Sequence, residues 1–187
     1  ELLVVDDFSP AGTVADVQRM HREADRLFRA QGNQAGRQRM TADANLRPAK
    51  PPRGLIQSTG EDVPRGQSLR ARLLVSDLPR EGPGALNLEK LTGCQADASA
   101  GLYAQAMAGF LRWLAPRYED IRGELKARIG SFRQAAHQSR QHRRLADIVG
   151  SLAVGFDHFL IFAQEAGAVT QTEAEGLWAR CWAALGE

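Results

Sequence analysis

The sequence contains little cysteine, few aromatic residues and no long hydrophobic run. Its two cysteines, Cys94 and Cys181, lie far apart without metal-type spacing, which is typical of ordinary thiols in a cytoplasmic protein. No run of about twenty apolar residues is present, so we expect no membrane span. A basic start and a small-residue cleavage site are missing, which argues against a signal peptide. The first residue is Glu rather than Met, which suggests a piece of a longer protein.

The net charge is only +2, but the charges are unevenly distributed. Residues 112–144 contain nine basic and three acidic residues, whereas residues 145–187 contain one arginine and six acids. Residues 32–53 carry a single acid and five basic residues, namely Arg37, Arg39, Arg47, Lys50 and Arg53. Clustered positive charge favours a polyanionic partner, and the alternative is a set of solvated faces.

The first part of the chain, residues 1–82, has an α/β pattern. Residues 2–5 form an apolar, β-rich run that predicts a strand buried on both faces. Helical spacing predicts a helix over residues 13–30, with Thr13 and Asp16 spaced as in a capping box. Residues 54–58 and 73–78 are two further short strand candidates.

The second part, residues 83–187, is predicted to be entirely helical. Apolar residues recur at helical spacing through most of it, and Thr170 with Glu173 forms a capping box at the start of the last helix. The expected helices cover residues 85–91, about 97–114, about 118–133, a strongly apolar segment around 145–160, and the segment from 170 onward.

Polar side chains follow the ends of the predicted strands. Asp6 and Asp7 end the first, Ser58 and Thr59 end the second, and Asp77 lies near the end of the third. Ligands of open α/β sheets bind at this edge, and carboxylates at such a position suit Mg²⁺. Asp6 is then the metal-associated acid and Asp7 orients a water; the alternative is that Asp7 caps a helix and Thr59 caps a turn.

Two arginines stand just ahead of the third strand candidate, in the stretch GQSLRARLL. Arg70 or Arg72 could reach a phosphate bound on a neighbouring subunit, the arginine-finger role. The alternative is that they pair with Asp62 or Asp77 and are structural.

Taken in order, the stretches LLVVDDFSPAG, RAQGNQAGRQRM and LRPAKPPRGLIQSTGEDVPRGQSLRARLL give a family resemblance. Together they resemble the ATPase domain of helicase and primase–helicase proteins of actinobacterial plasmids, phages and integrative elements, over roughly residues 1–110. The resemblance implies a partial P-loop NTPase sheet of the RecA/AAA-like type. It makes Asp6 a Walker B acid, Ser58 or Thr59 a sensor, and Arg70 and Arg72 trans-acting arginines.

One element of that family is missing from the sequence. The pattern G-x-x-x-x-G-K-[ST] does not occur, and none of Lys50, Lys90 and Lys126 follows a glycine-rich turn. The resemblance places this loop upstream of the first strand. We therefore expect a C-terminal part of an ATPase that does not hydrolyse ATP alone, with ATP and Mg²⁺ bound only in the full-length protein.

The long segment from 32 to 53 is the candidate nucleic-acid contact. Glycines, several cationic side chains and few aromatics suit tracking of a single-stranded DNA backbone, and residues 43–45 could form a hairpin tip. The alternative is a surface loop without a ligand.

These patterns lead to one favoured function and two alternatives. The favoured one is an ATP-driven DNA helicase or translocase working as a homo-oligomeric ring in plasmid or phage replication. The first alternative is a nucleotide-dependent regulator or packaging ATPase that does not unwind DNA. The second is a DNA-binding or scaffold module without catalysis.

Overall fold

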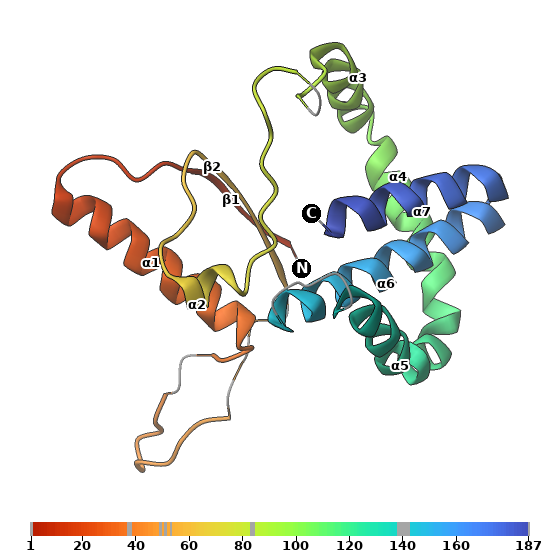
Figure 1. Cartoon of the computed structure of the whole chain (residues 1–187). Helices are drawn as coiled ribbons and strands as arrows, with labels where there is room; N and C mark the ends of the chain where they lie inside the picture. The colour runs from red at the N-terminus through yellow and green to blue at the C-terminus, as the bar shows by residue number, and fades with distance from the viewer. Residues whose placement is uncertain are drawn as a thin grey trace. The chain divides into compact units, whose positions relative to one another are not determined.

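A computed structural model of the chain describes residues 2–36, 39–48, 50, 52, 54–82, 85–137 and 143–186, with side chains from residue 145 onward in the last stretch. The chain divides into two compact units, residues 1–74 and residues 75–187 (Figure 1). Among the described residues, the first unit contains two strands and two helices, and the second contains helices as its only regular elements. The predicted α/β start and helical continuation are therefore confirmed.

The first unit is built on a two-stranded parallel sheet. Strand β1 spans Leu2–Phe8 and strand β2 spans Leu55–Gly60, with Leu2 opposite Leu55 and Val5 opposite Ser58. Helix α1, Val14–Gly32, connects them, and the short helix α2, Gln67–Arg70, follows β2. The Thr13–Asp16 capping box is confirmed: the Thr13 hydroxyl accepts from the Asp16 N–H at 3.3 Å, and the Asp16 carboxylate accepts from the Thr13 N–H at 3.2 Å.

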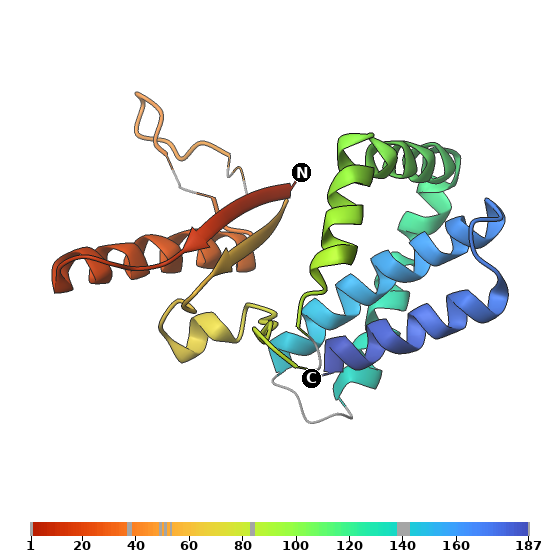
Figure 2. The same cartoon turned by 90° about the horizontal axis from the view of Figure 1, so that it is seen from above.

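The core of this unit lies between the sheet and α1 (Figure 2). It is formed by Phe8, Ala24, Phe28 and Leu69, with Met20, Ile56 and Leu73 packed around them. The opposite face of the sheet is different, because alternation along the strands places Leu2, Val4 and Leu55 there. These three side chains are 53–57% exposed.

The prediction of a third strand over residues 73–78 is wrong. These residues form no strand in the structure. Leu73 packs against the α1 core, whereas Val75 and Leu78 are exposed. The run is apolar enough for a strand, but a strand also needs a hydrogen-bonded neighbour, and neither β1 nor β2 pairs with it.

The second unit consists of five α-helices and one 3-10 turn among the described residues. These are α3 Leu88–Ser99, α4 Leu102–Leu114, the 3-10 turn η1 Ala115–Arg117, α5 Tyr118–His137, α6 Arg143–Glu165 and α7 Gln171–Gly186. The predicted capping box of the last helix is confirmed, because the Glu173 carboxylate accepts from the Thr170 N–H at 2.8 Å. That hydrogen bond, together with one from the Thr170 hydroxyl, holds the pKa of Glu173 below its usual value.

Helix α6 is the central helix of this unit and contacts α4, α5 and α7 (Figure 2). The core is formed by Ala136, Ala146, Val149, Ala153 and Leu185. Within the described residues, the segment Leu145–Glu165 of this helix is long and apolar enough to cross a membrane. It also packs on three other helices, as the core helix of a helical domain does.

Candidate functional site

The polar end of β1 contains a bulge that brings both aspartates to β2. Val5 pairs with Ser58 and Phe8 pairs with Gly60, so Asp6 and Asp7 together face Thr59. Bulges are rare between parallel strands, and they redirect side chains near functional sites. Asp7 has φ 56°, in the left-handed region, which aspartate tolerates better than most residues. The irregular backbone of β1 is therefore confined to the two aspartates, Asp6 and Asp7.

Thr59 holds this bulge through its hydroxyl group. The hydroxyl donates to the Asp6 Oδ1 at 2.5 Å and accepts from the Asp7 N–H at 3.0 Å. Ser58 points its hydroxyl elsewhere, 3.4 Å from the Thr59 carbonyl oxygen. Sequence reasoning left Ser58 and Thr59 as equivalent candidates, and the structure brings only Thr59 to the acids.

The ends of the two strands are held close together. The Ser9 hydroxyl donates to the Glu61 carboxylate at 3.4 Å, which joins the loops that follow β1 and β2. Gly60 is needed at this point, because a Cβ there would overlap the Phe8 carbonyl oxygen. Asp6, Asp7 and Glu61 thus lie at the carboxyl end of the strand pair, and all three residues are exposed.

His21 lies buried beneath this edge and was not singled out by its sequence position. Its ring is 7% exposed and meets Phe8 edge-on, with 5.6 Å between ring centroids. Its Nε2 lies 3.6 Å from the Asp62 carboxylate, and neither ring nitrogen has a hydrogen bond within the described part of the chain. Only the helical period of α1, which directs His21 toward the core with Ala24 and Phe28, could have identified it.

The donor set at the strand ends fits a loosely held Mg²⁺ better than a protein-enclosed metal. No group of three or more His, Cys, Asp and Glu side chains suited to a metal occurs among the described residues. Mg²⁺ commonly takes one or two carboxylates and completes its shell with water and substrate phosphates. Asp6 keeps one carboxylate oxygen away from Thr59, and Asp7 lies beside it. These two residues could hold the ion only together with a phosphate ligand.

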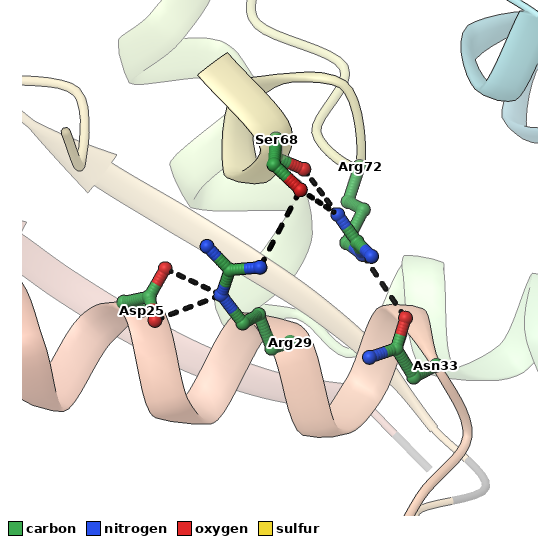
Figure 3. Close-up of polar contacts among 5 residues, drawn as sticks. All are labelled: Asp25, Arg29, Asn33, Ser68 and Arg72. Atoms are coloured by element: carbon green, nitrogen blue, oxygen red, sulfur yellow. Dashed lines mark hydrogen bonds and ion pairs between the residues drawn. The ribbon is translucent and has the colours of Figure 1, made fainter. Parts of the chain in front are cut away.

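The two candidate arginines have different environments (Figure 3). Arg72 donates from Nε to Asn33 Oδ1 at 3.1 Å and from its guanidinium to the Ser68 hydroxyl at 2.9 Å and the Ser68 carbonyl. Arg29, paired with Asp25 at 2.7 Å, reaches the same Ser68 hydroxyl. Arg72 therefore fastens α2 to the end of α1.

Arg70 is exposed, and its side chain forms no hydrogen bond or ion pair with another described residue. The alternative interpretation was that these arginines pair with Asp62 or Asp77. Within the described structure, neither arginine forms an ion pair with either aspartate. Arg72 is instead held by Asn33 and Ser68, and Arg70 remains available to a ligand.

The basic segment contains a short hairpin. Met40 and Leu46 form an antiparallel bridge, and Thr41 donates its N–H to the Asn45 carbonyl at 2.7 Å, with Ala44 at φ 57° in the tip. The predicted tip at 43–45 is confirmed. Arg47 donates its N–H to the Arg39 carbonyl at 2.9 Å, so the two exposed arginines lie opposite each other. Lys50 is also exposed, and Arg37 and Arg53 lie outside the described residues.

The opposed Arg39 and Arg47 side chains are expected to destabilise the hairpin, because like charges directly opposite each other on paired strands repel. Neither the Arg39 nor the Arg47 side chain pairs with an acid in the described part of the chain. An anionic ligand would relieve this repulsion. In the comparisons with known proteins, no protein-family model, no curated protein and no solved structure matches the chain.

Proposed function

We propose that residues 1–74 are part of a Mg²⁺- and ATP-dependent motor that moves on DNA, a helicase or translocase. The observation that carries the proposal is the parallel strand pair whose carboxyl ends bring Asp6, Asp7 and Thr59 together. Ligands of open α/β sheets bind at this edge. The exposed apolar face of Leu2, Val4 and Leu55 also fits a piece of a larger parallel sheet, because such sheets are covered on both faces.

In this proposal each residue has a distinct role. Asp6 would hold the Mg²⁺, which supplies charge neutralisation to the phosphates when it is bound. Thr59 fixes the Asp6 carboxylate and the Asp7 backbone. Asp7 accepts a hydrogen bond from the attacking water and orients it. The phosphate-binding loop must come from polypeptide outside these 187 residues, so the chain alone is expected to show no ATP turnover.

Arg70 is the better candidate for an arginine that acts on a neighbouring subunit's phosphate. Arg70→Ala is expected to leave stability unchanged and to lower ATP turnover of the full-length oligomer by about 10³-fold, the usual loss for an arginine finger. Arg72→Ala is the matched control, because it removes contacts to Asn33 and Ser68 and is expected to cost about 1–2 kcal/mol of unfolding free energy. Turnover assays and urea denaturation of both variants measure the two effects. Normal turnover in Arg70→Ala would remove this role.

The hairpin at residues 39–47 is proposed to contact the DNA backbone. Replacing Arg39 and Arg47 with glutamate is expected to weaken single-stranded DNA binding uniformly across sequences. The slope of log K against log salt concentration should also become less negative by about 1.4, because each of the two lost phosphate contacts to a single strand contributes about 0.7 to that slope. Fluorescence anisotropy over a salt series provides both numbers.

The control for that experiment is Arg19→Glu together with Arg22→Glu, which reverses two charges on α1 outside the hairpin. This variant has the same change in net charge, so it corrects for a general electrostatic effect. Equal losses in the two variants would contradict a specific role of the hairpin.

A further inference from the structure

The hydroxyl group of Ser68 is contacted by two arginines that come from different parts of the first unit (Figure 3). Arg72 donates to this hydroxyl from its guanidinium at 2.9 Å, and Arg29 of α1 reaches it from Nη1 at 3.4 Å. The Arg72 guanidinium also donates to the Ser68 carbonyl oxygen. Two guanidinium groups, which we call the arginine pair, therefore converge on one neutral oxygen atom.

The surroundings of Ser68 are rich in positive charge. Residues 63–76 contain three arginines and no acid. The Asp25 carboxylate accepts from the Arg29 Nε at 2.7 and 2.8 Å, whereas the contact with Ser68 uses the terminal nitrogen Nη1. The carboxylate and the hydroxyl thus occupy different edges of the same guanidinium, and the edge that faces Ser68 meets an uncharged group.

A phosphate group on the Ser68 Oγ would strengthen both contacts. A serine hydroxyl carries no charge and has two lone pairs, whereas phosphoserine carries a charge of about −1.5 to −2 and three strong acceptor oxygens. Hydrogen bonds from arginine to phosphate are roughly twice as strong as those between neutral groups. A phosphate placed opposite clustered arginines therefore gains several charge-assisted hydrogen bonds.

We propose that Ser68 is a phosphorylation site whose phosphate is held by Arg29 and Arg72. Ser68 is exposed, so its hydroxyl is within reach of a modifying enzyme. Helix α2 has only four residues, and such a short helix opens locally at small cost, which lets the segment enter a kinase active site. Protein kinases also select substrates by charge pattern, and Arg65 stands three residues before Ser68.

The phosphate donor is a nucleoside triphosphate bound to a protein kinase. The Ser68 Oγ forms a bond to the γ-phosphorus, and the bond from that phosphorus to the β,γ-bridging oxygen breaks. The nucleoside diphosphate leaves with the electron pair, and the Oγ proton passes to the catalytic carboxylate of the kinase. The product tightens the contact between α2 and α1, because Arg29 belongs to α1. The inference does not depend on the motor chemistry proposed above, so the two can fail separately.

Phosphorus NMR of the full chain with phosphoserine encoded at position 68 tests the arginine pair. We expect the midpoint of the second phosphate ionisation to lie about half a pH unit or more below that of phosphoserine at position 99, because nearby cations favour the dianion. Ser99 is the matched control, since it is exposed on α3 and its hydroxyl donates to the Gln95 carbonyl at 2.9 Å. Arg29→Gln should remove most of the difference, and Arg19→Gln on the same helix should keep it.

Hydrogen exchange provides a second readout on the same samples. The amides of α2 should exchange at least about tenfold more slowly in the chain phosphorylated at Ser68 than in the unmodified chain, because charge-assisted hydrogen bonds oppose local opening. The amides of α7, which belongs to the other unit, should exchange at the same rate in both. Circular dichroism verifies that each variant keeps its helix content. If Arg29→Gln loses helix, the comparison of positions 68 and 99 in the otherwise unchanged chain decides the question.

Labelling by a kinase that selects arginine three residues before the acceptor tests Ser68 as the modified residue. Mass spectrometry should locate the phosphate on Ser68, and Arg65→Ala should slow the labelling by about tenfold or more. A chain that carries no phosphate on Ser68 after this treatment would overturn the proposal. So would equal ionisation midpoints at positions 68 and 99 in folded chains. Weaker binding of single-stranded DNA by Arg29→Gln without any shifted midpoint would assign the arginine pair to a nucleic acid, which also overturns it.

Discussion

Asp6→Asn is expected to reduce the ATP turnover of the full-length protein by about 100-fold or more. In the proposed mechanism Asp6 is the acid that holds the Mg²⁺, and a metal ion contributes several kcal/mol to stabilising the transition state. A loss of about 3 kcal/mol corresponds to a factor of about 100 in rate. Asparagine keeps the size of the side chain and can still accept the Thr59 hydrogen bond, so the fold should be retained. A coupled ATPase assay with a Mg²⁺ titration measures the effect.

Two neighbouring substitutions make this experiment specific. Thr59→Ala removes the hydroxyl that fixes both aspartates, so we expect a loss of about tenfold, smaller than that of Asp6→Asn. Ser58→Ala is the control, because among the described residues the Ser58 hydroxyl meets only the adjacent Thr59 carbonyl oxygen, at 3.4 Å, and the turnover of this variant should equal that of the wild type. Full turnover in a folded Asp6→Asn variant would eliminate the motor proposal.

Local features of this chain were predictable from the sequence. Both capping boxes, at Thr13 and Thr170, depend on residues three positions apart, and both are present. The start of α3 was predicted too early, because its actual cap is Asn87, whose side chain accepts the Lys90 N–H at 2.9 Å. A glycine within the helix, Gly93, also made the pattern look as if it ended sooner.

Features that depend on distant contacts were not predictable. The bulge at Asp6 and Asp7 exists because of the register with β2, more than fifty residues away. The difference between Arg70 and Arg72 depends on which of them meets Asn33 at the end of α1. The run at 73–78 shows the reverse case, since its local pattern favours a strand but it pairs with neither β1 nor β2. The sequence thus nominates the candidate residues, but their arrangement depends on contacts that the sequence does not reveal.

Gly150→Ala is expected to destabilise the helical unit, although alanine is the better helix former. Gly150 lies on α6 next to the α5 backbone, and an added Cβ would come 2.9 Å from the Ile129 carbonyl oxygen and 3.2 Å from the Arg133 backbone nitrogen. Both atoms belong to the α5 backbone, so the helix itself must move. Such overpacking usually costs about 1–3 kcal/mol of unfolding free energy. The better helix propensity of alanine returns about 1 kcal/mol, so the two effects nearly cancel only when the overpacking cost is at its smallest.

Gly155→Ala is the matched control on the same helix, because nothing lies within 4 Å of the Cβ it would add. It should stabilise the unit by about 0.5–1 kcal/mol through backbone entropy alone. The two variants carry the same chemical change five residues apart on one helix, so only the contact with α5 can give them opposite signs. All three tryptophans, Trp113, Trp178 and Trp182, belong to residues 75–187, so their fluorescence during urea unfolding follows this unit. Stabilisation by both substitutions would show that α5 and α6 do not pack as closely at Gly150 as the structure places them.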